Sequence, residues 1–598
     1  MQQRVVSRPE GRLVAVQPDI TSVRQSFTYL VPPAWEEDGR ATKVQVGSLV
    51  RIDFGGRRTA GWVTAVDVDF DDTVEVRPLA KWSSYGPPQA VLELAEWAAW
   101  RWAGRLPHLL RAASPPRMVP LVRHRPPTPA IDAGGHESAF DGAVTLVRTA
   151  PADTGIGLAL GAAAQGAALI LVSTISQRRA LARALRDAGV GVAEYDDQWE
   201  RSASGATTVG TRTAAFAPMP HIDAVLVLDE HDSTYKEERT PAWNARDVAI
   251  ERARQADVPC VLASPTPSLE AHRVASRTLI PDRVTEKRSW PRVDVIDMRV
   301  QDTPGLLSEG IVDVIRGDGP VACILNRKGR ARMLACATCS SLAACTECGG
   351  ALREDDDGRL ACDRDDTVRP MVCNECNGTH MKQLRLGISR LAEDLEALAK
   401  RPVVEVSADT AAQDLTGNTL FVGTEALLHR MESAKAVIFL DFDQELAVPR
   451  YRAAEDAFGL LALAARRVGP RADGGRIIIQ TRRPDDVVVQ AALNGEPGRV
   501  ATAQRDVRQV FQQPPYGAWA LVSGAGAEAF IQSLQQICGI SGPNIDHQSS
   551  QKRSEVQIHR LGDRWRVSAS DHETLLNAIN ATERPAARIR IEVDPLNI

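Results

Sequence analysis

Apolar residues gather in four short runs along the first part of the chain, between residues 12 and 67. Short β-rich runs separated by turn residues are typical of strands. The runs are RLVAV, FTYLV, SLVRIDF and TAGWVTAV, and glycines punctuate them. We therefore predict a β-rich domain over residues 1–84. Helical spacing and many tryptophans follow in residues 86–112, and then a proline-rich stretch. These predict a helical segment and linker over residues 85–136.

The pattern changes after residue 136, where continuous apolar runs alternate with segments of helical periodicity. Apolar strands that alternate with helices are typical of a parallel sheet covered on both faces. Two such sets occur in series, over residues 137–285 and 286–495. Residues 505–598 have the pattern of a small α+β domain. The fold class predicted is therefore α/β, with two parallel-sheet lobes between a β-rich N-terminal domain and a C-terminal α+β domain.

Seven of the ten cysteines fall within a stretch of the second lobe. They form three C-x-x-C pairs and one half-pair, in which Asp365 follows a lone cysteine at the same spacing. The residues concerned are Cys336, Cys339, Cys345, Cys348, Cys362, Asp365, Cys373 and Cys376. Two C-x-x-C turns can close one tetrahedral zinc site, so four half-sites predict two structural zinc ions in a module over residues 336–381. Spacing alone does not say which half-sites share an ion.

Two other interpretations of the cysteines are disfavoured. Disulfides would suit a secreted protein, and nothing in the sequence marks secretion. The first residues lack the apolar stretch of a signal peptide, and no apolar run approaches the roughly 20 residues that span a bilayer. A catalytic zinc would keep an open position and usually a histidine or glutamate ligand. We therefore expect a cytoplasmic protein with no membrane partner.

The charge balance restricts how the chain could bind nucleic acid. Its net charge is −5, so there is no global attraction for phosphates, and contacts must come from local basic patches. Two candidates are the pair Arg57 and Arg58, at the tip expected for FGGRRTAGW, and the run from Arg327 to Arg332. Solvated loop charges are the alternative interpretation of the N-terminal pair.

Several motifs together indicate a family. The run VLVLDEHDSTYKEE ends a predicted strand in Asp229 and Glu230, an acidic pair of the kind that holds magnesium and polarises the attacking water in nucleotide hydrolysis. VGTRTAAFAP, ASPTPSLEA, ILNRKGRARM, FVGTEALLHR and LAARRVGPR occur in the order found in helicase motors, which also have two α/β lobes in series. With the cysteine module, FTYLVP, FGGRRTAGWV and the C-terminal IEVDPLNI, the chain resembles the PriA family of primosomal replication-restart proteins.

The resemblance implies ligands and partners. The outer two C-x-x-C pairs would share one zinc, and the inner half-sites the other, with Asp365 as its carboxylate ligand and Asp363 or Asp366 as alternatives. The N-terminal domain would meet the 3′ end of a strand at a fork, although Thr28 stands where the family has an acidic residue. Phosphate contacts are then expected from Arg51, Arg57 and Arg58. The partners implied are forked or branched DNA, other primosome proteins and the system that loads the replicative helicase.

The segment that would bind the phosphates of ATP differs from the family's sequence pattern. A phosphate loop needs glycines and a lysine, but RTAPADTGIGLAL contains Gly155 and Gly157 with no lysine, and Asp153 adds negative charge. No lysine occurs between Lys81 and Lys236.

The acidic box and the arginine box also differ from the family's sequence pattern. The acidic box, DEHDSTYK, is one residue shorter than the family pattern. ARRVGPR replaces the family's arginine box, with Arg467 matching its first arginine and Pro470 standing at the second. Asp229, Glu230 and Arg467 would thus form a degenerate nucleotide site, and ATP is a doubtful ligand.

We therefore expect a DNA-binding protein of the replication-restart primosome that recognises stalled or abandoned forks and helps to reload the replicative machinery without helicase activity. Two alternatives remain open. One is an active ATP-dependent 3′-to-5′ DNA helicase with a divergent phosphate loop. The other is a zinc-ribbon interaction protein that works through partner proteins and scarcely touches DNA.

Overall fold

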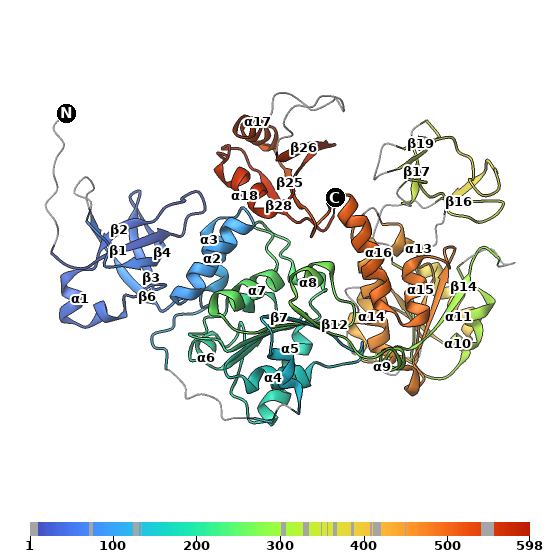
Figure 1. The fold of residues 1–598 in the computed structure, drawn as a ribbon, viewed down its shortest axis with the longest axis horizontal. Helices are drawn as coiled ribbons and strands as arrows, with labels where there is room; N and C mark the ends of the chain where they lie inside the picture. The colour runs from blue at the N-terminus through green and yellow to red at the C-terminus, as the bar shows by residue number, and fades with distance from the viewer. Residues whose placement is uncertain are drawn as a thin grey trace.

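The structure is a computed structural model that describes most of the 598 residues. The described ranges are 10–70, 76–123, 131–132, 134–300, 306–326, 334–347, 350–355, 357–362, 367–383, 388–406, 410, 420–448, 450–539 and 555–597. They form two parallel α/β lobes, a β-rich N-terminal domain, a small cysteine module and a C-terminal α+β domain (Figure 1). The predicted fold class is thereby confirmed. None of the described helices is both long enough and apolar enough to span a membrane.

The N-terminal domain is one six-stranded sheet with the order β5-β2-β1-β4-β3-β6. Its strands are β1 (Leu13–Pro18), β2 (Phe27–Leu30), β3 (Leu49–Phe54), β4 (Arg57–Val66), β5 (Arg77–Pro78) and β6 (Lys81–Ser84), and the short helix α1 (Pro33–Glu37) follows β2. Val14 and Val16 of β1 and Ile52 of β3 are fully buried and belong to the core of this domain. Helices α2 (Gln89–Arg101) and α3 (Leu106–Ala113) follow and share a core with the first lobe.

The first lobe is built on a seven-stranded parallel sheet with the order β13-β7-β12-β11-β8-β10-β9. Its strands are β7 (Val144–Arg148), β8 (Ala168–Leu171), β9 (Val192–Glu194), β10 (Thr207–Gly210), β11 (Ala224–Leu228), β12 (Cys260–Ser264) and β13 (Arg277–Leu279). Helices α4 (Ile156–Ala164) and α5 (Ile175–Asp187) cover one face, and α7 (Ala245–Ala256) with α2 and α3 covers the other. Because helices cover both faces of this sheet, its strands are continuous apolar runs in the sequence.

The second lobe has a six-stranded parallel sheet with the order β14-β24-β23-β15-β22-β21. Its strands are β14 (Arg292–Asp297), β15 (Val321–Ile324), β21 (Val403–Val406), β22 (Leu420–Gly423), β23 (Ala436–Phe439) and β24 (Arg476–Thr481). Its helices include α10 (Val312–Arg316), α11 (Ile388–Ala399), α12 (Glu425–Arg430), α14 (Ala453–Val468), α15 (Val487–Asn494) and α16 (Pro497–Val510). Since Val500 of α16 belongs to this core, the lobe continues past the boundary predicted at residue 495.

The cysteine module is inserted between β15 and α11, as the sequence predicts. It contains the short strands β16 (Leu334–Cys336), β17 (Leu352–Glu354), β18 (Leu360–Cys362), β19 (Val368–Arg369) and β20 (Met381–Gln383). These form one two-stranded and one three-stranded antiparallel sheet. In Figure 1 the module stands out from the second lobe, on the same side of the molecule as the C-terminal domain.

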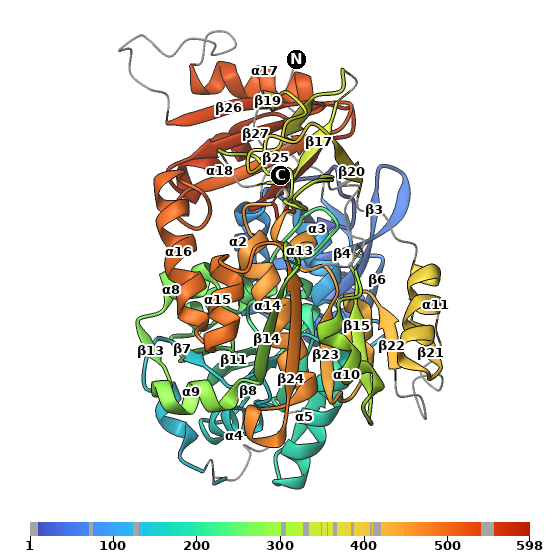
Figure 2. The same ribbon diagram turned by 90° about the vertical axis from the view of Figure 1, so that its right-hand side faces the viewer.

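The C-terminal domain is a four-stranded antiparallel sheet with two helices. It comprises β25 (Ala518–Ser523), α17 (Ala527–Cys538), β26 (Val556–Leu561), β27 (Arg564–Ala569), α18 (His572–Ala581) and β28 (Arg590–Val593). The buried Lys236 of the first lobe donates to the carbonyls of Val593 and Asp594 at 2.6 and 3.1 Å, and Arg101 pairs with the Asp594 carboxylate at 2.7 Å. These bonds hold the domain over the first lobe (Figure 2).

Candidate functional site

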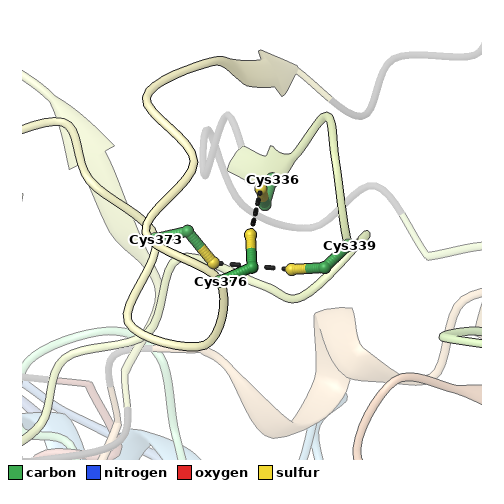
Figure 3. Close-up of side chains that lie close together, drawn as sticks. All are labelled: Cys336, Cys339, Cys373 and Cys376. Atoms are coloured by element: carbon green, nitrogen blue, oxygen red, sulfur yellow. Dashed lines mark hydrogen bonds between the residues drawn. The ribbon is translucent and has the colours of Figure 1, made fainter.

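Four cysteines of the module converge on one point (Figure 3). The Sγ atoms of Cys336 and Cys376 lie 3.5 Å apart, as do those of Cys339 and Cys373, and all four sulfurs lie within 4.8 Å of one another. Zinc–sulfur bonds of about 2.3 Å in a tetrahedron place the sulfurs about 3.8 Å apart. The arrangement therefore fits one tetrahedral metal ion held by the outer two C-x-x-C pairs.

Each C-x-x-C pair lies in a backbone turn of its own, and the two turns are of the same type. The amide of Ser340 donates to the carbonyl of Cys336, and the amide of Asn377 to that of Cys373, each at 3.0 Å. Ser340 and Asn377 have φ values of 60° and 59°, so each turn ends in the left-handed conformation, which places both sulfurs of a pair on one side. Two equivalent turns facing each other supply four ligands.

The surroundings of Cys336 and Cys339 favour the charged thiolate form of these two side chains. Burial raises the pKa of Cys336, but the amides of Cys339 and Thr338 and the neighbouring thiols outweigh it and lower that pKa below its ordinary value. A thiolate is the form that binds a metal. At Cys376 the Gly378 amide acts to lower the pKa, but the thiols of Cys339 and Cys336 outweigh it and raise that pKa to about 12. The geometry of the four sulfurs is therefore what carries the metal assignment.

The second predicted metal site lies only partly within the described residues. Cys345 and Cys362 pack in the small core of the module. Cys348 and Asp365, together with its alternatives Asp363 and Asp366, lie outside the described residues. A second zinc ion therefore stays a prediction.

The predicted DNA contacts fall on two separate parts of the N-terminal sheet. Arg51 lies opposite Ala60 of β4 and Lys81 of β6, whereas Thr28 is aligned through Ala15 with Ala65. Ala60 and Ala65 are five residues apart on one strand, which corresponds to about 17 Å. The structure therefore does not bring Thr28 and Arg51 together.

The basic side chains form a patch that the sequence revealed only in part. Arg51, Arg58 and Lys81 are exposed and lie on one face of the sheet. Arg57 pairs with Phe54 and so points from the opposite face at the hairpin tip. Lys81 was missed because its proximity to Arg51 depends on the pairing of β3 with β6. The other predicted basic run, Arg327 to Arg332, lies outside the described residues.

The phosphate-loop position is occupied by the chain itself. Gly155 caps the N-terminus of α4 with φ 75°, and its amide donates to the carboxylate of Asp153 at 2.8 Å. Backbone amides at a helix N-terminus are the groups that would otherwise hold a phosphate. The space beside this loop measures about 10 Å³ and is lined by Asp153, Gly155, Gln177 and Asp229 among others. That volume is close to the minimum for one water molecule.

The acidic pair is engaged within the protein. Asp229 is buried and accepts two hydrogen bonds from the guanidinium of Arg466, at 2.5 and 2.8 Å, and one from Gln177 at 2.9 Å. Burial alone would raise the pKa of Asp229, but the charge and hydrogen bonds of Arg466, with smaller contributions from His231 and Gln177, lower it below its ordinary value. The side chain is therefore a carboxylate that is already neutralised.

Glu230 has a structural environment of its own. It is 2% exposed and accepts bonds from the amide and hydroxyl of Ser268, each at 2.7 Å, and from Arg246 at 3.2 Å. Ser268 is the N-cap of α8 (Leu269–Val274). Both carboxylate oxygens thus accept bonds from Ser268 that fix the start of α8.

The arginine at this site differs from the expected one. The sequence comparison pointed to Arg467, but its Nε donates to the Leu428 carbonyl at 2.7 Å within the second lobe. Arg466, the preceding residue on α14, reaches Asp229 and also donates to the Pro151 carbonyl at 2.8 Å. Successive residues on a helix are rotated by about 100°, so only one of the two can face the first lobe.

A larger cavity, of about 920 Å³, lies where the two lobes meet the C-terminal sheet. Its walls come from the loop after β11, from α14 and from β27 and β28. Charged side chains of both signs line it in nearly equal numbers, nine Asp or Glu against seven Lys or Arg, and Asp229 and Arg466 are among them.

Taken together, the fold and the sites define a class of protein with two parallel α/β lobes and a four-cysteine site that could hold a metal ion. Residues 13–115 match the family model described as "3'DNA-binding domain (3'BD)" of PriA. The chain is 26% identical to the "Probable replication restart protein PriA" of Mycobacterium leprae, over 96% of this chain and 99% of that protein. It is also 26% identical to the "Replication restart protein PriA" of Bacillus subtilis, over 66% of this chain and 54% of the relative. The resemblance to PriA proteins is thereby confirmed.

The extent of the matches differs between relatives. The chain spans about half the length of several curated relatives, such as 54% of the Bacillus subtilis protein and 56% of the Synechocystis one. Among solved structures, a DEAD box protein from Methanococcus jannaschii matches with a TM-score of 0.31 and 10% identity, over 61% of this chain and 87% of that chain.

Proposed function

We propose that this protein is a DNA-binding factor of replication restart that recognises forked or branched DNA and does not use ATP to unwind it. The observation that carries the DNA-binding part is the match of residues 13–115 to a 3′ DNA-binding domain. The exposed patch of Arg51, Arg58 and Lys81 lies within that domain and offers phosphate contacts.

The proposal that ATP is not hydrolysed rests on the phosphate loop. Asp153 holds the amide that would bind a phosphate, and no lysine is available in this lobe before Lys236, whose amine is bound to the C-terminal domain. Glu230 is fully engaged by Ser268 and Arg246. Phosphoryl transfer depends almost wholly on positioning and charge neutralisation, so the loss of these parts has a large effect on the rate.

The outer cysteine site supports a structural zinc, which is the metal that four thiolates in a tetrahedron favour. Its residues Cys336, Cys339, Cys373 and Cys376 would hold the ion and fold the module. The ion would supply no chemistry to a reaction, since all four positions are taken by the protein. We propose the module as a contact for other primosome proteins or for the helicase-loading system, in a cytoplasmic setting.

The test is to measure fork binding and DNA-stimulated ATP hydrolysis on one preparation. The expected result is that forks bind more tightly than duplex of equal length, without nucleotide, and that ATP turnover stays at background. ATP turnover stimulated by DNA would favour the active helicase instead. Failure to bind forks at low salt would favour a protein that acts only through protein partners.

A further inference from the structure

The two lobes are joined by ion pairs that cross the interface between them. Arg466 of the second lobe pairs with Asp229 of the first, and Arg452 of the second lobe donates to Glu270 of the first at 2.5 Å. Arg508 of α16 lies 3.7 Å from Glu270 as well. Pairs of this kind, shielded from water, hold two bodies more firmly than exposed ones do.

Close backbone approach accompanies these pairs. A Cβ added to Gly459 of α14 would lie 3.3 Å from the ring of His231, the residue after the acidic pair. His231 is in turn hydrogen-bonded to Ser264 at the end of β12, at 2.8 Å. Helix α14 therefore packs directly onto the loop of the first lobe that a nucleotide-bound metal would face.

Arg466 joins the two loops that would grip a nucleotide. Its guanidinium donates to Pro151 in the phosphate loop and to Asp229 in the acidic box. In a nucleotide hydrolase the phosphates and their magnesium ion connect these same two loops. Here one cationic side chain from the second lobe makes that connection.

We propose that Arg466 stands in for the nucleotide and fastens the two lobes in one arrangement whether or not ATP is present. This inference rests on the proposed function, in which the core is catalytically silent. The arginine stays charged at any physiological pH, and its two bonds to a buried carboxylate are charge-assisted. The lobes then serve as a rigid frame between the N-terminal DNA-binding domain and the C-terminal domain.

Hydrogen–deuterium exchange of the full-length protein tests the inference without DNA. Arg466→Ala should accelerate exchange in residues 149–157 and 453–468 by about tenfold to hundredfold, because hydrogen bonds to charged groups contribute about 1.5–3 kcal/mol and 1.4 kcal/mol is a factor of ten. Asp229→Ala should have a similar effect, and the double variant should exchange no faster than the single ones, as coupled residues do. Arg467→Ala is the matched control, since it removes a neighbouring arginine whose side chain donates to the Leu428 carbonyl of its own lobe.

Three outcomes would overturn the inference. One is unchanged exchange in Arg466→Ala, and another is an additive effect in the double variant. The third is uniform acceleration that includes β23 at the centre of the second lobe, which would indicate lost global stability instead of a released interface. Fork binding, measured on the same proteins, separates this inference from the proposed function. If the parent protein binds forks but the exchange experiment shows no link through Arg466, the inference is wrong and the proposed function still stands.

Discussion

At the scale of single residues, the acidic pair illustrates how a motif can persist in sequence and have a different role in structure. Asp229 neutralises an arginine, and Glu230 fixes the start of α8 through Ser268. Each carboxylate oxygen of the pair accepts a hydrogen bond from the protein, from Arg466 or Gln177 at Asp229 and from Ser268 or Arg246 at Glu230. The chemistry of such a motif therefore depends on what its oxygens contact, which sequence does not record.

This environment makes Glu230→Gln a stability variant. The neutral side chain should weaken the bonds to Ser268 and leave the buried Arg246 with less compensating charge, so we expect a loss of about 1.5–3 kcal/mol in the free energy of unfolding. Urea denaturation measures it, with Glu238→Gln, an exposed glutamate of the same loop, as the control. An ATPase activity present in the parent and abolished in Glu230→Gln would show instead that Glu230 is catalytic.

The basic patch of the N-terminal domain gives a second prediction at this scale. Removing two phosphate contacts with Arg51→Ala and Lys81→Ala should weaken fork binding equally for all sequences. It should also reduce the slope of log affinity against log salt by about 1.4 to 1.8, at about 0.7 to 0.9 per contact. Fluorescence anisotropy at several salt concentrations measures both quantities.

The control for this experiment is Arg471→Ala. That residue is an exposed arginine of the second lobe, so its loss should leave the slope unchanged. Arg57→Ala tests separately whether the hairpin tip binds DNA, because the side chain of Arg57 lies on the opposite face of the sheet. If the double variant keeps the parent's salt slope, the DNA path lies elsewhere on the molecule.

At the scale of elements, the cysteine module contains two equivalent turns whose geometry fits a shared metal ion. Cys376→Ser should remove one equivalent of zinc and unfold the module, because small metal domains derive their folding free energy from the metal. Zinc content by mass spectrometry measures this, with Cys538→Ser, a cysteine outside the module, as the control. A zinc content equal to that of the parent would show that Cys376 is not a ligand.

Asp365→Ala addresses the second predicted ion separately. It should lower the zinc content by up to one equivalent and leave the outer site filled. A zinc content of two ions in this variant would exclude Asp365 as a ligand and leave Asp363 or Asp366 to be tested in the same way.

The elements also show what could be predicted from the sequence. Two parallel sheets followed from continuous apolar runs between helices, and the insertion of the module followed from the cysteine positions. The position of Lys81 beside Arg51 and the separation of Thr28 from both depend on strand register, which apolar alternation does not determine. The role of Arg466 depends on the rotation of α14 against a partner lobe, and tertiary packing sets that rotation.

At the scale of the whole molecule, the parts are held together by buried charges. Lys236 illustrates this at the C-terminal domain: burial lowers its pKa to about 8, while the nearby carboxylates of Asp594 and Glu592 act to raise it. Its ammonium group donates to two carbonyls at the end of β28.

Acid should weaken the contact between the lobes through Asp229. Its pKa in the folded protein is lower than the ordinary value of about 3.9, so its stabilising contribution is fully present above that value and is lost as pH falls through the lower, folded-state pKa. The difference in unfolding free energy between the parent and Arg466→Ala should therefore be constant from about pH 5 to 7. Below about pH 4 it should shrink. Urea denaturation of both proteins across this range measures it, with Arg467→Ala as the control. A difference that stays constant down to pH 3 would show that the charge of Asp229 does not hold the two lobes together.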